Sequence, residues 1–468
     1  METPRLNVEQ MAGAIHQHRD EDHDKIRLML ATLRAADIVE VLNAVPSLAE
    51  AAETLTLIPL AMATDVCNYS NLARRSPLLE QSTPDLAAKL LEGMASDERT
   101  ATVRKMSDHG RRILLPLLSN DARKEVENQL KYPEDTAGDL MTTEFVRLDP
   151  TMLVKDAVDF IRQVARDRES VYACYVVEPG TDRLLGAVSL RDLVMAAVDR
   201  PVSEIMRPHP VTVTALEPRK HAVQKISKYN LLALPVVEGD NRIVGFITVD
   251  DAIDAIVDDQ TNTVLRMGAV EPGALDEPYM ACPWLTLVKK RATWLVLLFL
   301  GEMLTATAMG HFEAEIAHAV VLALFVPLII SSGGNSGSQA TSLLIRALAL
   351  NEVRLNQWAQ VLRRELVSGA SLGIILGTVG MLRIALWQWL QWYDYGVYWE
   401  RVAITVGLSL MGIVLWGSVA GSMLPFLLKR LGLDPATSSA PFVATLVDVT
   451  GLIIYFTVAK IVLSGALL

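Results

Sequence analysis

The hydrophobic pattern divides the chain into two parts. Up to about residue 288 the sequence mixes charged and apolar positions like a water-soluble protein, whereas long apolar runs dominate the remainder. A helix of about 20 residues crosses roughly 30 Å of hydrocarbon, and several runs reach that length. We therefore expect five transmembrane helices near residues 291–310, 316–337, 366–389, 400–427 and 440–465.

Basic residues indicate the orientation of these helices. Lys and Arg cluster before the first run, between the second and third, and between the fourth and fifth. The other two connections, around Gly310 and Asp394, are poor in them. Because cytoplasmic loops are enriched in Lys and Arg, we expect a cytoplasmic N-terminus and a C-terminus outside. Aromatic residues around Asp394 fit the membrane–water boundary on the outer side.

Two acidic residues fall inside the predicted spans. Asp448 lies in the fifth span, and no basic residue in the spans is an obvious partner for it. A carboxylate at that depth costs about 2.5–3.5 kcal/mol on insertion scales. An ion site explains its presence, and a protonated Asp bonded to a neighbouring helix is the structural alternative. Glu302, in the first span, either lines a pathway or is a neutral acid at a helix interface.

The second predicted span ends in the glycine-rich segment VPLIISSGGNSGSQ. Pro327 lacks an N–H and is expected to kink the helix. The glycines of GGNSG permit either an unwound backbone along a cavity or close helix packing. Asn335 adds an amide oxygen, and Mg²⁺ is bound by one or two carboxylates with further oxygen donors and retained waters. Because the spans lack a His or Cys cluster, a zinc or copper site is not expected.

The soluble part contains helices followed by a repeat. Residues 1–131 show amphipathic helical periodicity broken by Pro and Asp or Asn turns, which predicts a domain of short stacked helices, solenoid-like. Residues 132–200 and 201–262 are two copies of one pattern. Each copy has an opening Met, two β-rich strands and a strand–Asp–helix element, at Asp192 and Asp251. The repeat looks like paired CBS domains, regulatory α/β modules that often bind adenine nucleotides or ions.

An acid-rich helix follows the second copy. In DDAIDAIVDDQTNTVLRMGAV, Asp251, Asp254 and Asp258 fall near one helical face, with Asp259 beside them. Like charges at this density repel each other. This acidic face is either simply exposed to solvent or binds cations. Cation binding is favoured because the helix leads into the first span. We assign residues 263–288 to a connecting helix region and 289–468 to an all-α transmembrane domain.

Composition and motifs argue against other classes of protein. A net charge of −11 does not suit a nucleic-acid binder. The three scattered cysteines form neither a disulfide framework nor a zinc motif, and the polar first residues do not form a signal peptide. We expect no enzyme, because the sequence has no Walker motif, nucleophile elbow or metal-hydrolase pattern.

An ordered set of motifs resembles the MgtE magnesium transporter family over essentially the whole chain. These are YPEDTAGDLMTT (132–143), SLRDL (189–193), LLALPVV (231–237), ITVDD (247–251), VPLIISSGGNSGSQ (326–339), LGLDPA (431–436) and VATLVDVTG (443–451). The resemblance implies a homodimer in the inner membrane that imports Mg²⁺. It also implies that intracellular Mg²⁺ bound to the helical and CBS domains closes the channel, and that some members bind ATP in the CBS domains.

The same resemblance assigns site residues. Asp448 becomes the carboxylate of the pore ion site, with the Ala444 carbonyl and the segment containing Asn335 beside it. The implied regulatory magnesium ligands are Asp97, Asp251, Asp254, Asp258 and Asp259, of which Asp259 matches a plug-helix acid near the membrane.

Three departures from the family pattern concern gating more than conduction. Asn262 and Thr263 stand where members often carry acids, Ala440 stands where Asn is common, and Glu302 is an additional acid. Two alternative functions remain at this stage. One is transport of another divalent cation, such as Co²⁺ or Mn²⁺, and the other is a non-conducting CBS membrane sensor.

Overall fold

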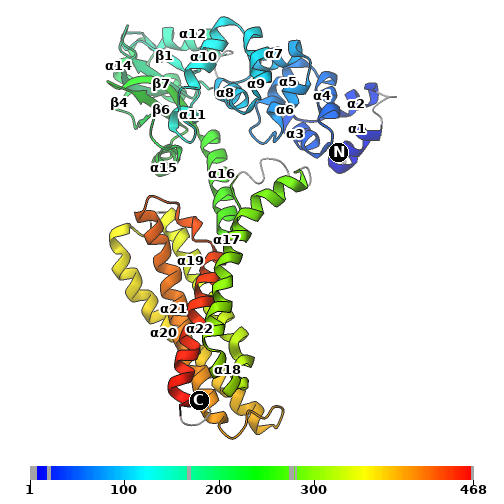
Figure 1. The fold of residues 1–468 in the computed structure, drawn as a ribbon. Helices are drawn as coiled ribbons and strands as arrows, with labels where there is room; N and C mark the ends of the chain where they lie inside the picture. The colour runs from blue at the N-terminus through cyan, green and yellow to red at the C-terminus, as the bar shows by residue number, and fades with distance from the viewer. Residues whose placement is uncertain are drawn as a thin grey trace, which may run out of the picture. The chain divides into compact units, whose positions relative to one another are not determined.

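The computed structural model describes residues 8–17, 23–165, 170–272, 279, 282–350 and 352–464 (Figure 1). The beginning of the predicted N-terminal domain and part of the predicted connecting region lie outside these residues. The chain divides into two compact units. The first unit comprises the residues up to Asp259 together with 276–281, and the second comprises Gln260–Leu275 and Cys282–Leu468. The predicted fold class is confirmed: stacked helices, a tandem α/β repeat, a connecting helix and five long apolar helices.

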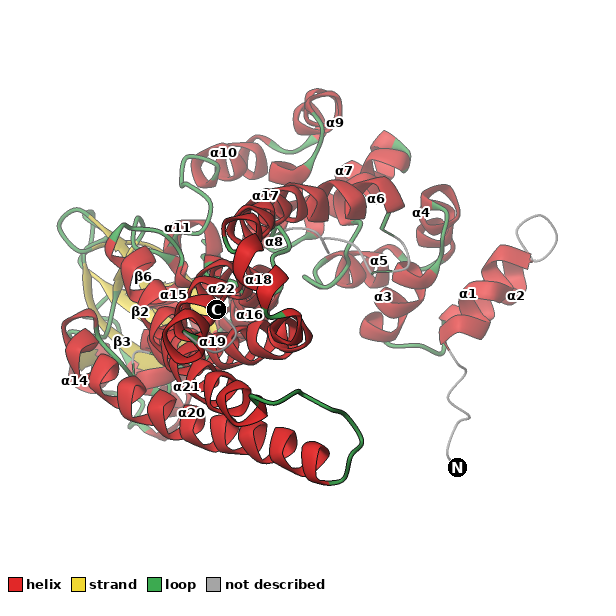
Figure 2. Ribbon diagram, turned by 60° about the horizontal axis from the view of Figure 1, so that its bottom comes forward, coloured by secondary structure: helices red, strands yellow, loops and turns green. Residues whose placement is uncertain are grey.

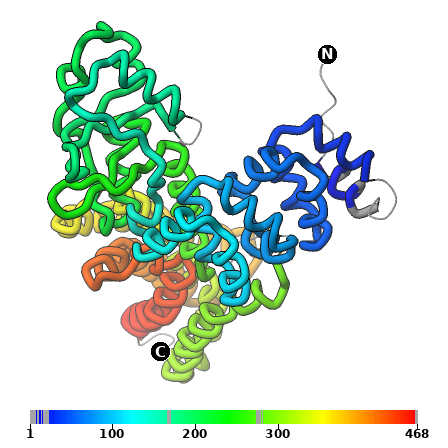
Figure 3. Tube along the Cα trace, turned by 90° about the horizontal axis from the view of Figure 1, so that it is seen from above, coloured from blue at the N-terminus to red at the C-terminus, as the bar shows by residue number. Residues whose placement is uncertain are grey.

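Short helices form the N-terminal part of the first unit. Most of them pack against the helix two places further along the chain. Figure 3 shows these short helices in blue to cyan. Side chains from one layer bind free backbone amides in a later one: Asn68 accepts from the Ala95 N–H at 3.0 Å, and Glu92 accepts from the Ser119 N–H at 3.0 Å. The helices are α1 Val8–Gln17, α2 His23–Leu30, α3 Ala35–Ala44, α4 Leu48–Leu57, α5 Leu60–Cys67, α6 Arg75–Gln81, α7 Pro84–Gly93, α8 Ser96–Lys105, α9 Asp108–Leu114, η1 Leu115–Leu117 and α10 Asn120–Gln129.

The tandem repeat folds into two small sheets with flanking helices (Figure 2, strands in yellow). In each copy a parallel pair, β1–β2 or β5–β6, is followed by an antiparallel pair, β2–β3 or β6–β7. The register shifts at Val176/Val177 in one copy and at Val236/Val237 in the other, which supports the repeat. The elements are α11 Ala137–Leu140, β1 Val146–Leu148, α12 Val154–Val164, β2 Ala173–Val177, β3 Leu184–Ser189, α13 Leu190–Met195, α14 Val202–Ile205, β4 Arg207–Pro208, β5 Val213–Thr214, α15 Arg219–Tyr229, β6 Ala233–Glu238, β7 Arg242–Thr248 and α16 Val249–Met267.

The second unit contains five helices long and apolar enough to cross a membrane among the described residues, as predicted. Helix α21 packs against α19, α20 and α22, and α17 packs against α22. The helices are α17 Trp284–His311, α18 Glu313–His318, η3 Val320–Phe325, α19 Val326–Ala349, η4 Leu355–Gln357, α20 Trp358–Trp389, α21 Trp399–Arg430, η5 Pro435–Thr437 and α22 Ala440–Leu463.

The second span differs from its prediction at Pro327, and the structure decides between the two interpretations of its glycines. Pro327 lies in the first turn of α19, where its missing N–H would have no helical partner, so it starts the helix without kinking it. The glycine segment does not unwind: α19 is helical from Val326 to Ala349. Close packing explains the glycines, because a Cβ on Gly417 or Gly421 would collide with the carbonyl groups of Gly333 or Gly337.

Candidate metal sites

An acidic cavity of about 280 Å³ lies in the first unit, between the N-terminal helices and the tandem repeat. The chain segments that line it are far apart in the sequence: α6, α8, α11 with the loop before it, α15 and α16. The lining contains eight acidic and four basic side chains, together with Ser70, Ala101, Leu140 and Ala255. The charged members are Asp97, Glu98, Glu134, Asp135, Asp139, Asp251, Asp254, Asp258, Arg75, Arg104, Lys105 and Arg219.

The basic side chains neutralise some of these acids. Arg75 pairs with Glu98 at 2.5 Å, and Arg104 pairs with Asp139 at 2.9 Å. Arg219 pairs with Asp135 at 3.2 Å, and also with Asp259 at 2.9 Å. The acids of α16 that line the cavity are different. Within the described part of the chain, Asp251, Asp254 and Asp258 form no ion pair with a Lys, Arg or His side chain.

Helix α16 directs one face of its first three turns toward this cavity. Thr248 and Asp251 exchange hydrogen bonds with each other's backbone amides, each at 3.3 Å, which is the capping box expected of a T-x-x-D sequence. One turn later, the Ser70 hydroxyl donates to Asp254 at 2.6 Å. The predicted spacing therefore places three carboxylates on one helical face, and the cap fixes where that face begins.

Burial and mutual repulsion disfavour the ionised forms of these carboxylates. Burial raises the pKa of Asp251 to about 6, with the nearby Asp250 and Glu98 charges adding to the rise. Burial likewise raises the pKa of Glu98, Asp139 and Asp258 above their ordinary values. A bound cation would favour the ionised forms.

The predicted cytosolic residues do not all meet. The cavity brings together Asp97, which is 8% exposed, with Asp251, Asp254 and Asp258. Asp259 is outside the lining and is paired with Arg219. Across the described ranges, no three His, Cys, Asp or Glu side chains converge closely enough to hold a metal ion directly. The cavity therefore offers a negative field and oxygen atoms rather than a preformed cage.

The second candidate site surrounds Asp448 in α22. Asp448 is half-buried, and Ala444 lies one turn before it in the same helix. Both approach Gly334 of α19: an added Cβ there would lie 3.5 Å from the Ala444 Cβ and 3.9 Å from Asp448 Oδ1. Asn335 follows Gly334, and its amide nitrogen donates to Ser331 at 3.5 Å. Asp448 and Ala444 of α22 thus lie next to Gly334 of α19, whereas the Asn335 side chain is exposed and contacts Ser331.

Polar contacts hold α19 in this position. Ser336 lies 2.7 Å from the Ser418 hydroxyl, and Thr341 donates to the Gly421 carbonyl at 2.8 Å. Both contacts are buried between α19 and α21, at the level where the glycines allow the two backbones to approach. Packing against α21 therefore leaves the backbone of Gly334 next to α22.

Asp448 has no counter-charge within the described ranges of the chain. Among the described residues, no side chain donates a hydrogen bond to its carboxylate or pairs with it. Lys460, on the same helix, pairs instead with Glu315 at 3.2 Å. Glu302 is exposed on α17, next to Gly301, whose added Cβ would lie 3.0 Å from Thr445 of α22. Its carboxylate is near enough to Asp448 to add to the negative potential there.

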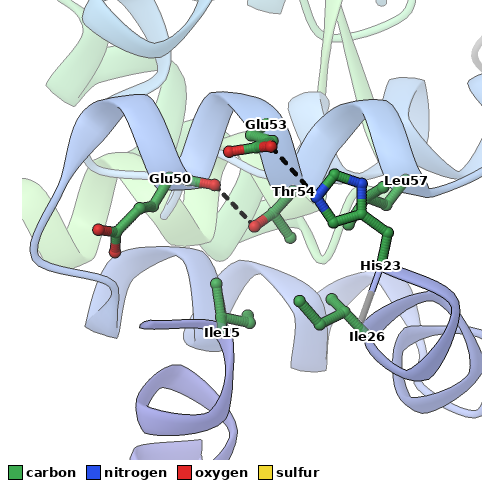
Figure 4. Close-up of a pocket in the computed structure, with 7 residues that line it drawn as sticks. All are labelled: Ile15, His23, Ile26, Glu50, Glu53, Thr54 and Leu57. Atoms are coloured by element: carbon green, nitrogen blue, oxygen red, sulfur yellow. Dashed lines mark hydrogen bonds and ion pairs between the residues drawn. The ribbon is translucent and has the colours of Figure 1, made fainter. Parts of the chain in front are cut away.

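A smaller hollow in the N-terminal helices has a structural explanation (Figure 4). Its volume is about 10 Å³, which is room for about one water molecule. His23 lies 3.3 Å from Glu53, and the Thr54 hydroxyl donates to the Glu50 carbonyl at 2.7 Å. The first contact joins α2 to α4, and the second lies within α4.

Sequence reasoning missed the partners that surround the α16 acids. Ser70, Arg75, Glu98 and Asp139 reach the cavity only through the fold, and one sequence gives no signal for contacts of that range. The capping box was readable, because TVDD has the required spacing of Thr and acid.

Comparisons with known proteins cover both units. Profiles described as "MgtE intracellular N domain", "CBS domain" and "Divalent cation transporter" match residues 33–135, residues 137–199 and 202–258, and residues 326–458, respectively. The magnesium transporter MgtE of Thermus thermophilus is 36% identical over 88% of this chain and 89% of its own. The magnesium transporter MgtE of Bacillus subtilis is 30% identical over 72% of this chain and 71% of its own.

A solved structure is similar to about half of the chain. The cytosolic domain of the Mg²⁺ channel MgtE in complex with ATP is 30% identical, with a TM-score of 0.49. The match covers 52% of this chain and 99% of that one.

Proposed function

The chain belongs to the MgtE family of divalent cation transporters and is a multi-pass membrane protein, and from this premise we propose that it imports Mg²⁺ under control of intracellular Mg²⁺. The transported ion passes Asp448, and Mg²⁺ bound to the first unit closes the pathway. The observation that carries the proposal is a half-buried carboxylate, in a transmembrane helix, without a counter-charge among the described residues.

The Asp448 site suits a hydrated divalent ion. An intramembrane carboxylate is costly unless it faces a partner, water or an ion. Mg²⁺ dehydrates reluctantly and keeps several waters, so one carboxylate with few further oxygen donors is an adequate donor set. In a two-fold homodimer, Asp448 of each subunit would supply a pair of carboxylates. At 100 mV, entry of a divalent cation gains roughly 4.6 kcal/mol, so no other energy source is required.

The acidic cavity supports the regulatory half of the proposal. Its acids outnumber its basic residues by two to one, and three α16 carboxylates lack an ion-pair partner in the described part of the chain. Mg²⁺ with part of its water shell would relieve that repulsion, through Asp97, Asp251, Asp254 and Asp258. A ligand shifts a conformational equilibrium only by its differential affinity for the two states. The proposal therefore requires that these acids lie closer together in the closed state than in the open one.

Helix α16 supplies the mechanical link. It is continuous over 19 residues, from Val249 to Met267, beginning in the first unit and ending in the second. When Mg²⁺ binding rearranges the acids of the cavity, it acts on the start of α16. The far end of α16 belongs to the second unit. Asp259, which pairs with Arg219, tethers the middle of this helix to α15.

Location, assembly and a second ligand complete the proposal. We expect an inner-membrane homodimer with a cytoplasmic N-terminus and an outer C-terminus, following the distribution of basic residues. ATP binding in the CBS pair stays a prediction. Transport of Co²⁺ or Mn²⁺, and a non-conducting sensor, are the competing functions.

Ion uptake by the full-length protein in liposomes separates these functions. We expect Mg²⁺ entry that falls as Mg²⁺ on the cytoplasmic face rises, with Co²⁺ and Mn²⁺ as weaker competitors. Stronger transport of Co²⁺ or Mn²⁺ would reassign the substrate. Folded protein without flux of any of the three ions would favour the sensor.

A further inference from the structure

Helix α16 ends in a fixed turn. Ala269 has φ 57°, the Val270 N–H donates to the Leu265 carbonyl at 2.9 Å, and the Ala269 N–H donates to the Arg266 carbonyl at 2.9 Å. These two bonds and the left-handed residue are a Schellman motif, which terminates a helix and satisfies its last carbonyl groups. The backbone of Arg266 is therefore held in the last turn of α16.

The loop between α21 and α22 is fixed in the same way. Gly432 has φ 79°, and the Leu433 N–H donates to the Leu428 carbonyl at 2.9 Å, which ends α21 in a second Schellman motif. Asp434 follows directly, and its Oδ1 accepts from the Ala436 N–H at 2.8 Å, capping η5. One oxygen of the Asp434 carboxylate thus holds the local turn.

The other oxygen of Asp434 binds Arg266. The guanidinium group of Arg266 forms an ion pair with Asp434 Oδ2, and both residues belong to the second unit. Helix α22 begins at Ala440, shortly after this loop, and carries Asp448. The end of α16 is therefore bonded to the loop that leads directly into α22, the helix that carries Asp448.

The sequence around Arg266 makes this charge stand out. In the stretch QTNTVLRM, residues 260–267, Arg266 is the one charged residue. Asn262 and Thr263, one turn before Arg266, are uncharged. A cation is therefore built into the end of α16, opposite a carboxylate of the transmembrane unit.

We propose that Arg266 is a positioning residue for gating, whose guanidinium joins α16 to the α22 side of the pathway through Asp434. This tethered cation stabilises the closed arrangement at the contact without requiring a bound magnesium ion there. The inference rests on the proposed function and adds to its regulation. Magnesium in the acidic cavity and Arg266 at the other end of α16 then act on one helix.

The effect of the contact is modest. The side chains of Arg266 and Asp434 are 37% and 40% exposed, so water and salt screen their attraction. Breaking a pair of this kind changes an equilibrium by about two- to five-fold. The pair therefore shifts the magnesium concentration at which the protein closes, whereas magnesium binding in the cavity causes the closure.

Flux through the full-length protein in liposomes tests the coupling. Arg266→Gln and Asp434→Asn should each raise the half-inhibiting cytoplasmic Mg²⁺ concentration by about two- to five-fold, and the double variant should shift it no further than the larger single. Asn retains a capping oxygen for η5. Arg430→Gln is the matched control, because Arg430 ends α21 without an ion pair among the described residues. Unchanged inhibition in both singles, or shifts that multiply in the double variant, would overturn the coupling.

Hydrogen exchange in the same proteins tests the contact independently of flux. The amides of residues 264–270 should exchange faster in Arg266→Gln and in Asp434→Asn than in the wild type, and at the wild-type rate in Arg430→Gln. Exchange unchanged in both Arg266→Gln and Asp434→Asn would refute the contact whether or not the protein conducts. A wild type that conducts without magnesium inhibition contradicts the gating part of the proposed function instead, and the exchange result then decides the contact alone.

Discussion

Thr248 and Asp251 each accept a hydrogen bond from the other's backbone amide at the start of α16, both at 3.3 Å. The same Asp251 carboxylate lines the acidic cavity. One side chain therefore helps to begin the helix and adds charge to the proposed regulatory site. Substitutions that keep or remove its oxygen atoms can separate these two roles.

Removing the cap should destabilise the first unit. Asp251→Asn keeps an acceptor oxygen and Asp251→Ala does not, while both remove the charge. We expect the Ala variant to unfold with a free energy lower than that of the Asn variant by about 0.5–2 kcal/mol. Thermal labelling of the buried thiols of Cys67 and Cys174, in a Cys282→Ser background, reports unfolding of this unit. Equal stability of the two variants would remove the capping role.

Removing negative charge from the cavity should raise the free energy of unfolding of the metal-free first unit. Asp254→Asn combined with Asp258→Asn relieves repulsion between carboxylates, so the metal-free first unit should become more stable. Saturating Mg²⁺, about 100 times its dissociation constant, should stabilise the wild type by about 2.7 kcal/mol and this variant by much less.

The same thiol-labelling melts, with EDTA or Mg²⁺, measure both quantities. Asp156→Asn is the control, because Asp156 is an exposed acid of α12 that does not line the cavity. Equal magnesium stabilisation of the wild type and the double variant would contradict the regulatory site.

The metal-free protein should also show a pH dependence traceable to Asp251. Because the folded-state pKa of Asp251 is raised to about 6 from 3.8, the folded state binds this proton more tightly than the unfolded state. The stability contribution of Asp251 therefore falls as pH rises from about 4 through about 6. The melting temperature of the wild type relative to Asp251→Asn should be higher at pH 5 than at pH 7, by circular dichroism in EDTA. A difference independent of pH would contradict the assignment.

The contact between α19 and α21 should not tolerate an added methyl group. A Cβ on Gly417 would collide with the backbone of Gly333, so Gly417→Ala must separate the two helices, at a cost of about 1–3 kcal/mol. Gly310→Ala is the control, because a Cβ at Gly310 meets no atom within 4 Å. Thermal unfolding, followed by fluorescence of the transmembrane unit, should have a lower midpoint in Gly417→Ala and an unchanged midpoint in Gly310→Ala.

The transmembrane prediction succeeded because the signal is local. Length and hydropathy define an apolar helix without knowledge of its neighbours, so all five helices were found, with errors at their ends. Pro327 and the glycines of α19 were harder to interpret. Their meaning depends on position in the helix and on Gly417 and Gly421, which lie far along the chain.

The candidate sites were predicted unevenly for the same reason. Helical spacing placed Asp251, Asp254 and Asp258 on one face, and the capping signal was present in TVDD. Contacts of Arg219 with Asp259, and of Arg266 with Asp434, depend on tertiary packing, and no pattern in one sequence specifies them. Charge inventory therefore predicted where acidic side chains gather, but not which of them are already neutralised.

Magnesium uptake by Asp448→Asn, reconstituted in liposomes beside the wild type, tests the central claim most directly. Asn keeps the size and an oxygen atom of the side chain while removing the charge that compensates a divalent ion. Glu313→Gln, an exposed acid of α18 outside the five apolar helices, is the matched control. We predict that Asp448→Asn protein folds and assembles like the wild type but takes up no Mg²⁺ above empty liposomes, whereas Glu313→Gln retains full uptake. Wild-type uptake through Asp448→Asn would contradict the account.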